Sequence, residues 1–272
     1  MVSVVSVQEV MDIMEGFAPK HLAEDWDNPG LLVGSPAQRT ERIVCCLDVS
    51  DGVVQQAIEA DAHLIVAHHP LIFKAMKNVR TDLPLGARIA KLLKHDIAVL
   101  AAHTNLDIAE GGVNDVLAEA IGVRKLSSFV IEQQDADGHA ASLGRIGSLP
   151  APMTIADFAA QVREALPTAH VRYVDAGPRP VRKVALCSGS GAEFIGRAAA
   201  LGADAYLTGD VRYHDAQHAA ELGLHLIDAG HFGTEFPVVA ALAARLRTLF
   251  DERSWRVEVV EDTAARDFFQ VL

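Results

Sequence analysis

Apolar and polar positions alternate along this chain in blocks that are typical of an α/β protein. Short continuous apolar runs predict buried strands, whereas longer segments with apolar positions three or four residues apart predict helices. Strands are expected at residues 43–48, 63–67, 97–102, 184–187, 205–208 and 224–228. Helices are expected at residues 7–17, 52–60, 85–94, 114–121, 155–166, 192–201 and 237–250. This order favours sheets with helices on their faces.

The alternation stops between residues 127 and 182, where segment 132–138 is polar and turn-like, and then resumes. The two alternating stretches look like copies of each other. Asp61-Ala62-His63-Leu64 matches Asp204-Ala205-Tyr206-Leu207, and a His-x-x-x-acid pattern recurs 128 positions later. We therefore expect two related α/β halves with mixed sheets. One half would comprise residues 1–126 with 232–272, and the other would comprise residues 127–231.

Three of the expected strands lead directly to histidine and acidic side chains. His68 and His69 follow the run at residues 63–67. His103 follows the next run with Asp107 four residues later, and His231 follows the last run with Glu235 four residues later. Ligand sites in open α/β sheets gather at the carboxyl ends of strands. These side chains therefore predict one polar site.

The chemistry of this set favours metal binding. Histidine nitrogen with carboxylate oxygen suits Zn, Fe, Mn or Co better than Mg or Ca. The set exceeds what one tetrahedral zinc ion uses, which predicts a dinuclear site between the two halves. Any one of these histidines alone is better explained by a hydrogen-bonded structural role, and a metal-free protein is the corresponding alternative. The remaining histidines considered are expected to be structural or at the surface: His21, His95, His139, His170, His218 and His225.

Two further polar strand ends leave their roles open. Ser188-Gly189-Ser190-Gly191 could hold a phosphate with backbone N–H groups, or it could be a tight turn that requires glycine. Thr208-Gly209-Asp210, with His214 nearby, could support the metal ligands, contact a substrate or cap a helix.

Composition narrows the function further. The formal net charge of −12 argues against a general binder of nucleic acid duplexes, although a small anionic substrate could still bind. Lys74, Lys77 and Arg80 supply a basic patch just after the histidine pair. No apolar run is long enough for a membrane span, and the N-terminal residues do not resemble a signal peptide. Cys45 and Cys46 fit a buried strand, so a cytoplasmic location is expected.

Several motifs occur together in an order that resembles a known family. They are Asp25-Trp26-Asp27-Asn28-Pro29-Gly30, His68-His69-Pro70, His103-Thr104-Asn105-Leu106-Asp107, Ser188-Gly189-Ser190-Gly191, Thr208-Gly209-Asp210 and Gly230-His231-x-x-Thr234-Glu235. The chain is similar to the GTP cyclohydrolase 1 type 2 homologs, the NGG-interacting-factor-like dinuclear-metal proteins. The likeness covers nearly the whole chain, which looks like the short form without an inserted middle domain.

The resemblance implies a specific set of ligands. Two divalent ions would be held by His68, His69, Asp107, His231 and Glu235, with Glu235 bridging them. His103 would lie beside the metals as an acid/base or supporting group. The resemblance also implies a toroidal homohexamer with its metal sites facing an internal cavity.

Two functions follow from these expectations. The first is a metal-dependent hydrolase that acts on a nucleotide or a related anionic small molecule, with the GTP cyclohydrolase reaction as one example. In it, His103 would transfer protons while the metals activate water. The alternative is a non-catalytic metal-binding or scaffold protein that interacts with partner proteins.

Overall fold

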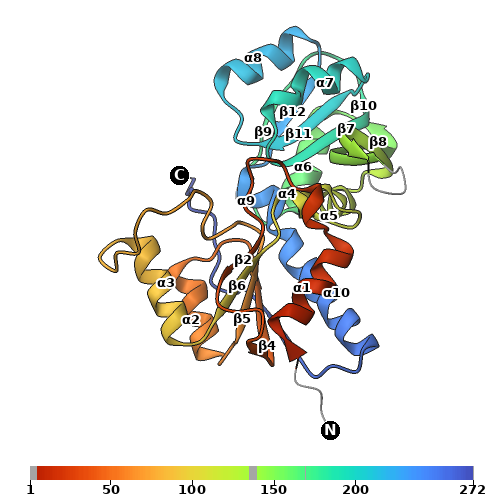
Figure 1. Ribbon diagram of the computed structural model, residues 1–272. Coiled ribbons are helices and arrows are strands. Elements are labelled where there is room, and N and C mark those ends of the chain that lie inside the picture. Colours follow the sequence, from red (N-terminus) through yellow and green to blue (C-terminus); the bar gives the residue numbers. More distant parts are fainter. Residues whose placement is uncertain (1–4, 135–139, 169, 272) are drawn as a thin grey trace. The chain divides into compact units, whose positions relative to one another are not determined.

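A computed structural model describes residues 5–134, 140–168 and 170–271 (Figure 1). The chain divides into two compact units. Unit 1 comprises Met1–Ala109 and Val239–Ala265, and unit 2 comprises Glu110–Val238 and Arg266–Leu272. The sequence predicted two halves, residues 1–126 with 232–272 and residues 127–231. These halves were defined by sequence similarity, whereas the two units are defined by spatial contacts, so the predicted halves stay a prediction.

Unit 1 contains a five-stranded mixed sheet in the order β13-β4-β5-β6-β2. Strands β13 (Glu258–Glu261), β4 (Arg42–Cys46), β5 (Leu64–Ala67) and β6 (Ala98–Ala101) run parallel, and β2 (Gly30–Val33) is antiparallel to β6. Every residue of β5 and β6 is buried. Parallel strands covered on both faces show such continuous apolar runs, which explains why the sequence pattern located them.

The helices of unit 1 connect and cover this sheet. They are α1 (Val7–Phe17), the short 3₁₀ helix η1 (Lys20–Leu22), α2 (Asp51–Glu59), α3 (Pro84–Lys94), α4 (Thr104–Ile108) and most of α10 (Pro237–Glu252). A small antiparallel pair, β1 (Val5–Ser6) with β3 (Arg39–Thr40), precedes the main sheet. Helix α1 begins at a capping box in which the Ser6 side chain accepts a hydrogen bond from Glu9. Val53 of α2 and Leu92 of α3 belong to the core that contains Ile65 of β5.

Unit 2 contains a six-stranded mixed sheet in the order β7-β8-β10-β11-β12-β9. Strands β10 (Val181–Ser190), β11 (Ala205–Gly209) and β12 (His225–Asp228) run parallel, and β9 (Arg172–Val174) is antiparallel to β12. The helices are α5 (Val113–Ala120), α6 (Ile155–Ala165), the 3₁₀ helix η2 (Ala192–Phe194), α7 (Ile195–Ala200), α8 (Tyr213–Glu221) and α9 (His231–Glu235). Leu117 of α5 and Phe158 of α6 share one buried core with Leu207 of β11.

The main departure from the sequence-based expectation lies in the segment that interrupts the alternation. Strands β7 (Arg124–Gln134) and β8 (Ala140–Met153) form an antiparallel pair there. Residues 132–134, expected in a turn, belong to β7, whereas 135–138 lie outside the described residues. The polar composition was misleading because polar side chains also occur along solvated antiparallel strands. The helix expected at 192–201 also differs, because its first turn is η2.

The two units share one chain order, which supports a duplication. Unit 1 has β4-α2-β5-α3-β6, unit 2 has β10-α7-β11-α8-β12, and an antiparallel strand borders the third parallel strand in each. Strand β5 starts three residues after Asp61 (φ 52°), and β11 starts three residues after Gly202 (φ 69°). Asp61 therefore corresponds to Gly202 and not to Asp204, so the sequence match was displaced by two residues.

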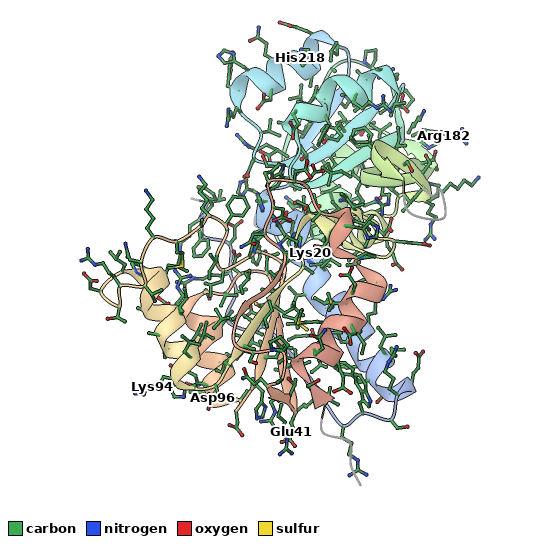
Figure 2. The ribbon with its side chains drawn as sticks, viewed as in Figure 1. Lys20, Glu41, Lys94, Asp96, Arg182 and His218 are labelled. Carbon is green, nitrogen blue, oxygen red and sulfur yellow. The ribbon has the colours of Figure 1, made fainter. Side chains whose placement is uncertain are left out.

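The parallel strands of unit 1 have their carboxyl ends on the same side of the sheet. Figure 2 labels Glu41 and Asp96, which precede β4 and β6 and therefore mark the amino ends of these strands. In the part of the chain that the structure describes, no helix has both the length and the apolar character needed to cross a lipid bilayer.

Candidate metal centre

Unit 1 gathers three imidazoles and a carboxylate at the carboxyl ends of its strands. The ring centroids of His68, His69 and His103 lie 5.0 to 5.6 Å apart, and one nitrogen from each lies within 4.8 Å of the others. Asp107 Oδ1 lies 3.6 Å from His68 Nε2. The structure therefore brings together four of the residues that the sequence singled out.

Strand register explains this gathering. Ala67 of β5 pairs with Ala101 of β6, so the residues that follow the two strands emerge side by side. The backbone N–H groups of His68 and His69 donate to the carbonyl oxygens of Cys46 and Leu47, at 3.1 and 2.9 Å, and extend the sheet ladder beyond β5. The two histidines consequently have little backbone freedom.

Each of the three clustered imidazoles of unit 1 uses its Nδ1 atom in a hydrogen bond to an oxygen acceptor. The acceptors are the Ala102 carbonyl oxygen for His68 (2.9 Å), Asp48 Oδ1 for His69 (2.9 Å) and Asp27 Oδ1 for His103 (2.7 Å). A carbonyl or an ionised carboxylate can only accept, so Nδ1 carries the proton in each ring. In a neutral ring this leaves the lone pair on Nε2, which is the arrangement found in metal-binding histidines.

Asp27 anchors the loop that precedes β2. Its side chain is fully buried, and it accepts hydrogen bonds from His103, from the Thr104 backbone N–H (3.0 Å) and from the Thr104 hydroxyl (2.5 Å). Burial by itself would raise the pKa of Asp27, but these hydrogen bonds and the charge of His103 lower that pKa from 3.8 to about 2. The carboxylate therefore stays ionised and fixes the orientation of His103.

Unit 2 contains the same kind of arrangement around His231. Its Nδ1 lies 2.8 Å from Asp210 Oδ2, and its Nε2 lies 3.0 Å from Glu235 Oε2. Residues four apart meet on one face of a helix, which is how α9 brings His231 and Glu235 together. The Glu235 side chain is buried, whereas His231 is 39% exposed.

The Ser188-Gly189-Ser190-Gly191 segment, whose first three residues end strand β10, supports Glu235. Its backbone N–H groups donate within unit 2: Ser188 to the Asn114 side chain, Gly189 to Thr234 and Gly191 to Thr208, each at 2.9 Å. These internal bonds count against phosphate binding by Ser188, Gly189 and Gly191, because their N–H groups already have acceptors. The tight turn is not found either, since residues 188–190 belong to strand β10. Gly189 has φ +60°, and a Cβ there would lie 2.2 Å from Glu235 Oε1. Glycine is thus required for the approach of Glu235.

Three roles were predicted for the Thr208-Gly209-Asp210 segment, and its hydrogen bonds favour the first, which is support of the proposed ligands. Thr208 Oγ1 accepts from Gly191, and Asp210 orients His231. At the end of β12, Asp228 Oδ1 accepts from the Gly230 backbone N–H (3.0 Å) and shapes the turn before His231.

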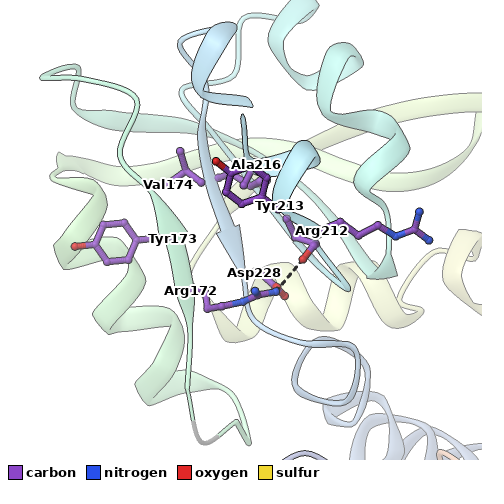
Figure 3. A pocket seen from close by; sticks show the side chains of 9 residues that line it. Arg172, Tyr173, Val174, Arg212, Tyr213, Ala216 and Asp228 are labelled. Atoms are coloured by element: carbon purple, nitrogen blue, oxygen red, sulfur yellow. Dashed lines mark hydrogen bonds and ion pairs between the residues drawn. The ribbon is translucent and has the colours of Figure 1, made fainter. Parts of the chain in front are cut away.

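The other side of Asp228 faces a separate cavity of about 250 Å³ in unit 2, which Figure 3 shows. Its described lining includes Arg172, Tyr173, Arg212 and Tyr213, and none of the predicted metal ligands. Arg172 forms an ion pair with Asp228, so this cavity and the turn before His231 share one carboxylate.

The histidines expected to be structural or at the surface fall into both classes. His225 is buried and bonded to the Arg179 carbonyl oxygen and the Ala176 N–H, whereas His21, His95 and His218 are exposed. His170 is partly buried, and His139 lies outside the described residues.

Sequence reasoning missed two supporting acids. Asp27 looked like part of a dense turn sequence, and Asp48 looked like the end of a strand. A polar residue directly after a buried run was the available signal for Asp48. No local signal identified Asp27 as the partner of His103, because the two residues are 76 positions apart.

Asp27→Asn tests the buried anchor in protein stripped of metal with EDTA. The depressed pKa means that ionised Asp27 stabilises the fold fully above its unfolded value of 3.8, and that this stabilisation disappears as the pH falls toward 2. In urea unfolding at pH 7, we expect the free energy of unfolding of Asp27→Asn to be about 1–2 kcal/mol lower than that of wild type. This difference between variant and wild type should become smaller below pH 4. Asp251→Asn, at an exposed position, should stay within about 0.5 kcal/mol of wild type. A loss that does not change with pH would contradict this explanation.

Gly189→Ala tests the close approach to Glu235. Gly202 is a matched control, since it also has positive φ (69°) but open space around its Cβ position. Gly202→Ala should cost about 1–2 kcal/mol from backbone strain alone. Gly189→Ala should lower the free energy of unfolding clearly more than Gly202→Ala does, because the Glu235 side chain must also move. Equal losses in thermal unfolding would show that Glu235 tolerates the methyl group.

Comparisons with known proteins find relatives that match nearly the whole chain. A 34% identical relative from Clostridium perfringens covers 98% of this chain and 99% of its own length, and one from Streptomyces coelicolor is 36% identical over 93% and 90%. Both are named GTP cyclohydrolase 1 type 2 homolog. The crystal structure of a Bacillus cereus protein related to NIF3 superposes with a TM-score of 0.94 at 28% identity, covering 99% of this chain and 100% of that one. The family model Duf34/NIF3 (NGG1p interacting factor 3) matches residues 5–267, and the chain therefore belongs to this family.

Proposed function

We propose that this protein is a metal-dependent hydrolase with a dinuclear divalent-metal centre, acting on a nucleotide or a related anionic small molecule. One observation carries the proposal. All four imidazoles of the predicted set, in both units, contact an oxygen acceptor through Nδ1, and Nε2 of His68 and of His231 lies 3.6 and 3.0 Å from the carboxylates of Asp107 and Glu235. Histidines with only a structural role have no common reason to share this polarity, whereas metal ligands do.

The donor atoms fit borderline divalent ions. His68, His69 and Asp107 in unit 1, with His231 and Glu235 in unit 2, are the proposed ligands, and they offer only nitrogen and carboxylate oxygen. This chemistry suits Zn, Fe, Mn or Co. When bound, such ions act as Lewis acids that increase the acidity of water and neutralise the negative charge that develops during hydrolysis.

His103 is proposed to carry the proton during hydrolysis. Its Nδ1 is held by Asp27, which would also stabilise the charged imidazolium once Nε2 accepts a proton. The His103 side chain is 16% exposed, so the ring is not fully enclosed by the protein. Its distance from His68 and His69 also fits a third ligand, and the two roles make different predictions.

The substrate class rests on charge and on the names of relatives. The basic patch of Lys74, Lys77 and Arg80 follows the histidine pair in a chain of net charge −12, which favours an anion near this loop. The relatives named GTP cyclohydrolase 1 type 2 homolog make nucleotides the first substrates to test. The toroidal homohexamer stays a prediction.

His68→Ala and Glu235→Gln test the metal centre from each unit separately. We expect wild-type protein to hold about two ions per chain and each variant to hold fewer, with hydrolysis reduced at least 100-fold in a screen of nucleotides that includes GTP. Elemental analysis and product detection give the two readouts. His218→Ala, at an exposed position labelled in Figure 2, should leave both unchanged.

Two outcomes would count against a metal-dependent hydrolase. Full turnover by EDTA-stripped protein would exclude the mechanism. Metal-loaded protein that converts no nucleotide but captures a partner protein would favour the non-catalytic scaffold.

His103→Gln separates proton transfer from metal binding. If His103 carries a proton, the variant should keep its metal content and lose about 100-fold or more in kcat, together with one limb of the pH–rate profile. Loss of metal in parallel with activity would instead identify His103 as a ligand.

A further inference from the structure

Two exposed aromatic side chains lie against His103 in unit 1. Trp26 is 60% exposed and Phe73 is 43% exposed. Their ring centroids are 5.9 Å apart in an edge-on arrangement, and each centroid lies 6.1 Å from that of His103. Isolated exposed apolar residues are ordinary, but a pair that contacts a candidate catalytic histidine calls for an explanation.

Buried polar anchors hold both rings in place. Trp26 directly precedes Asp27, whose fully buried carboxylate is bonded to His103 and Thr104. Two residues after Trp26, the Asn28 side-chain amide donates to the Ile72 carbonyl oxygen at 2.6 Å, and this bond ties the loop of Trp26 to the loop of Phe73. Trp26 is therefore exposed on a loop whose neighbouring residues are fixed, so a ligand that stacks on it has little loop ordering to complete.

The loop that carries Phe73 is locally basic. Residues 71–80 contain Lys74, Lys77 and Arg80 and no acidic residue, in a chain with 36 acidic and 24 basic residues. Arg80 forms an ion pair with Asp82. Within the described ranges, Lys74 and Lys77 form no ion pair, and both residues are exposed. Their charge remains available to an anion.

We propose that Trp26 and Phe73 form a stacking site for the planar ring of a nucleotide-class ligand, whose anionic group is attracted by Lys74 and Lys77. Aromatic side chains stack on the faces of heterocyclic bases, and nearby cations add attraction for phosphate. This assignment rests on the proposed function, since it concerns the substrate of the same site. Its test measures binding of the ring and not turnover, so the stacking site and the proposed hydrolase function can fail independently.

The chain offers a built-in reporter, because its two tryptophans are Trp26 and Trp255. In a Trp255→Phe background, fluorescence comes from Trp26 alone. EDTA-stripped protein would be titrated with AMP and GMP, with adenosine as a ring without phosphate and with ribose 5-phosphate as phosphate without a base. We expect saturable quenching by both nucleotides, weaker binding of adenosine and no quenching by ribose 5-phosphate.

Substitutions separate the contributions of ring and charge. Phe73→Ala should weaken AMP binding about tenfold, in line with stacking energies measured by alanine substitution. Lys74→Ala with Lys77→Ala should weaken AMP but not adenosine, and should reduce the salt dependence of AMP binding. Phe268→Ala, a matched surface aromatic that is 79% exposed, should change nothing. Circular dichroism of each variant checks that it is folded.

Three results of the binding experiment would overturn the proposal. They are no response of Trp26 to millimolar nucleotide, equal quenching by ribose 5-phosphate, and a change in emission that depends on protein concentration without ligand, which would assign the rings to a contact between copies. Turnover with an unchanged KM in Trp26→Ala and Phe73→Ala would also overturn it while leaving the hydrolase intact. Conversely, ring binding without turnover would support the stacking site and count against the hydrolase.

Discussion

The candidate centre depends on the hydrogen bonds that hold imidazole Nδ1 atoms. A histidine side chain at a strand end would otherwise sample several orientations, and fixing it costs conformational entropy. Here hydrogen bonds that form on folding offset the lost entropy. The acceptors are a backbone carbonyl for His68 and carboxylates for His69, His103 and His231. Nε2 of each ring is oriented before any ligand arrives, which is the general requirement for a precise site.

The two units reach this result with supporting acids from different parts of the fold. In unit 1, Asp27 comes from the loop before β2 and orients His103 after β6. In unit 2, Asp210 comes from the turn after β11 and orients His231 after β12. The strand order repeats between the units, but the partner of the histidine does not. If the two units arose by duplication, as the repeated strand order predicts, the hydrogen-bond support of the histidines is the part that differs between them.

The sequence predicted strands β4 to β6 and β10 to β12, because buried parallel strands are continuous apolar runs, as at β5 and β6. The short strands at the sheet borders, such as β2, β9 and β13, were not predicted. It also located His68, His103 and His231, since polar residues directly after such runs are conspicuous. The β7–β8 pair was not predicted, because its polar positions obscured the strand pattern. Asp27 escaped for a different reason: the local sequence shows a turn, and only the tertiary fold shows which histidine the carboxylate meets.

The buried cysteines of β4 have a consequence for the reactivity of their thiols. Burial raises the pKa of Cys45 to about 12 and that of Cys46 well above its ordinary value. Cys46 pairs with Ala67, which directly precedes His68, and Cys46 belongs to the apolar core of unit 1. The thiolate, and not the thiol, is the reactive nucleophile of cysteine. The sheet therefore keeps two unreactive thiols next to the strand that leads to the histidine pair.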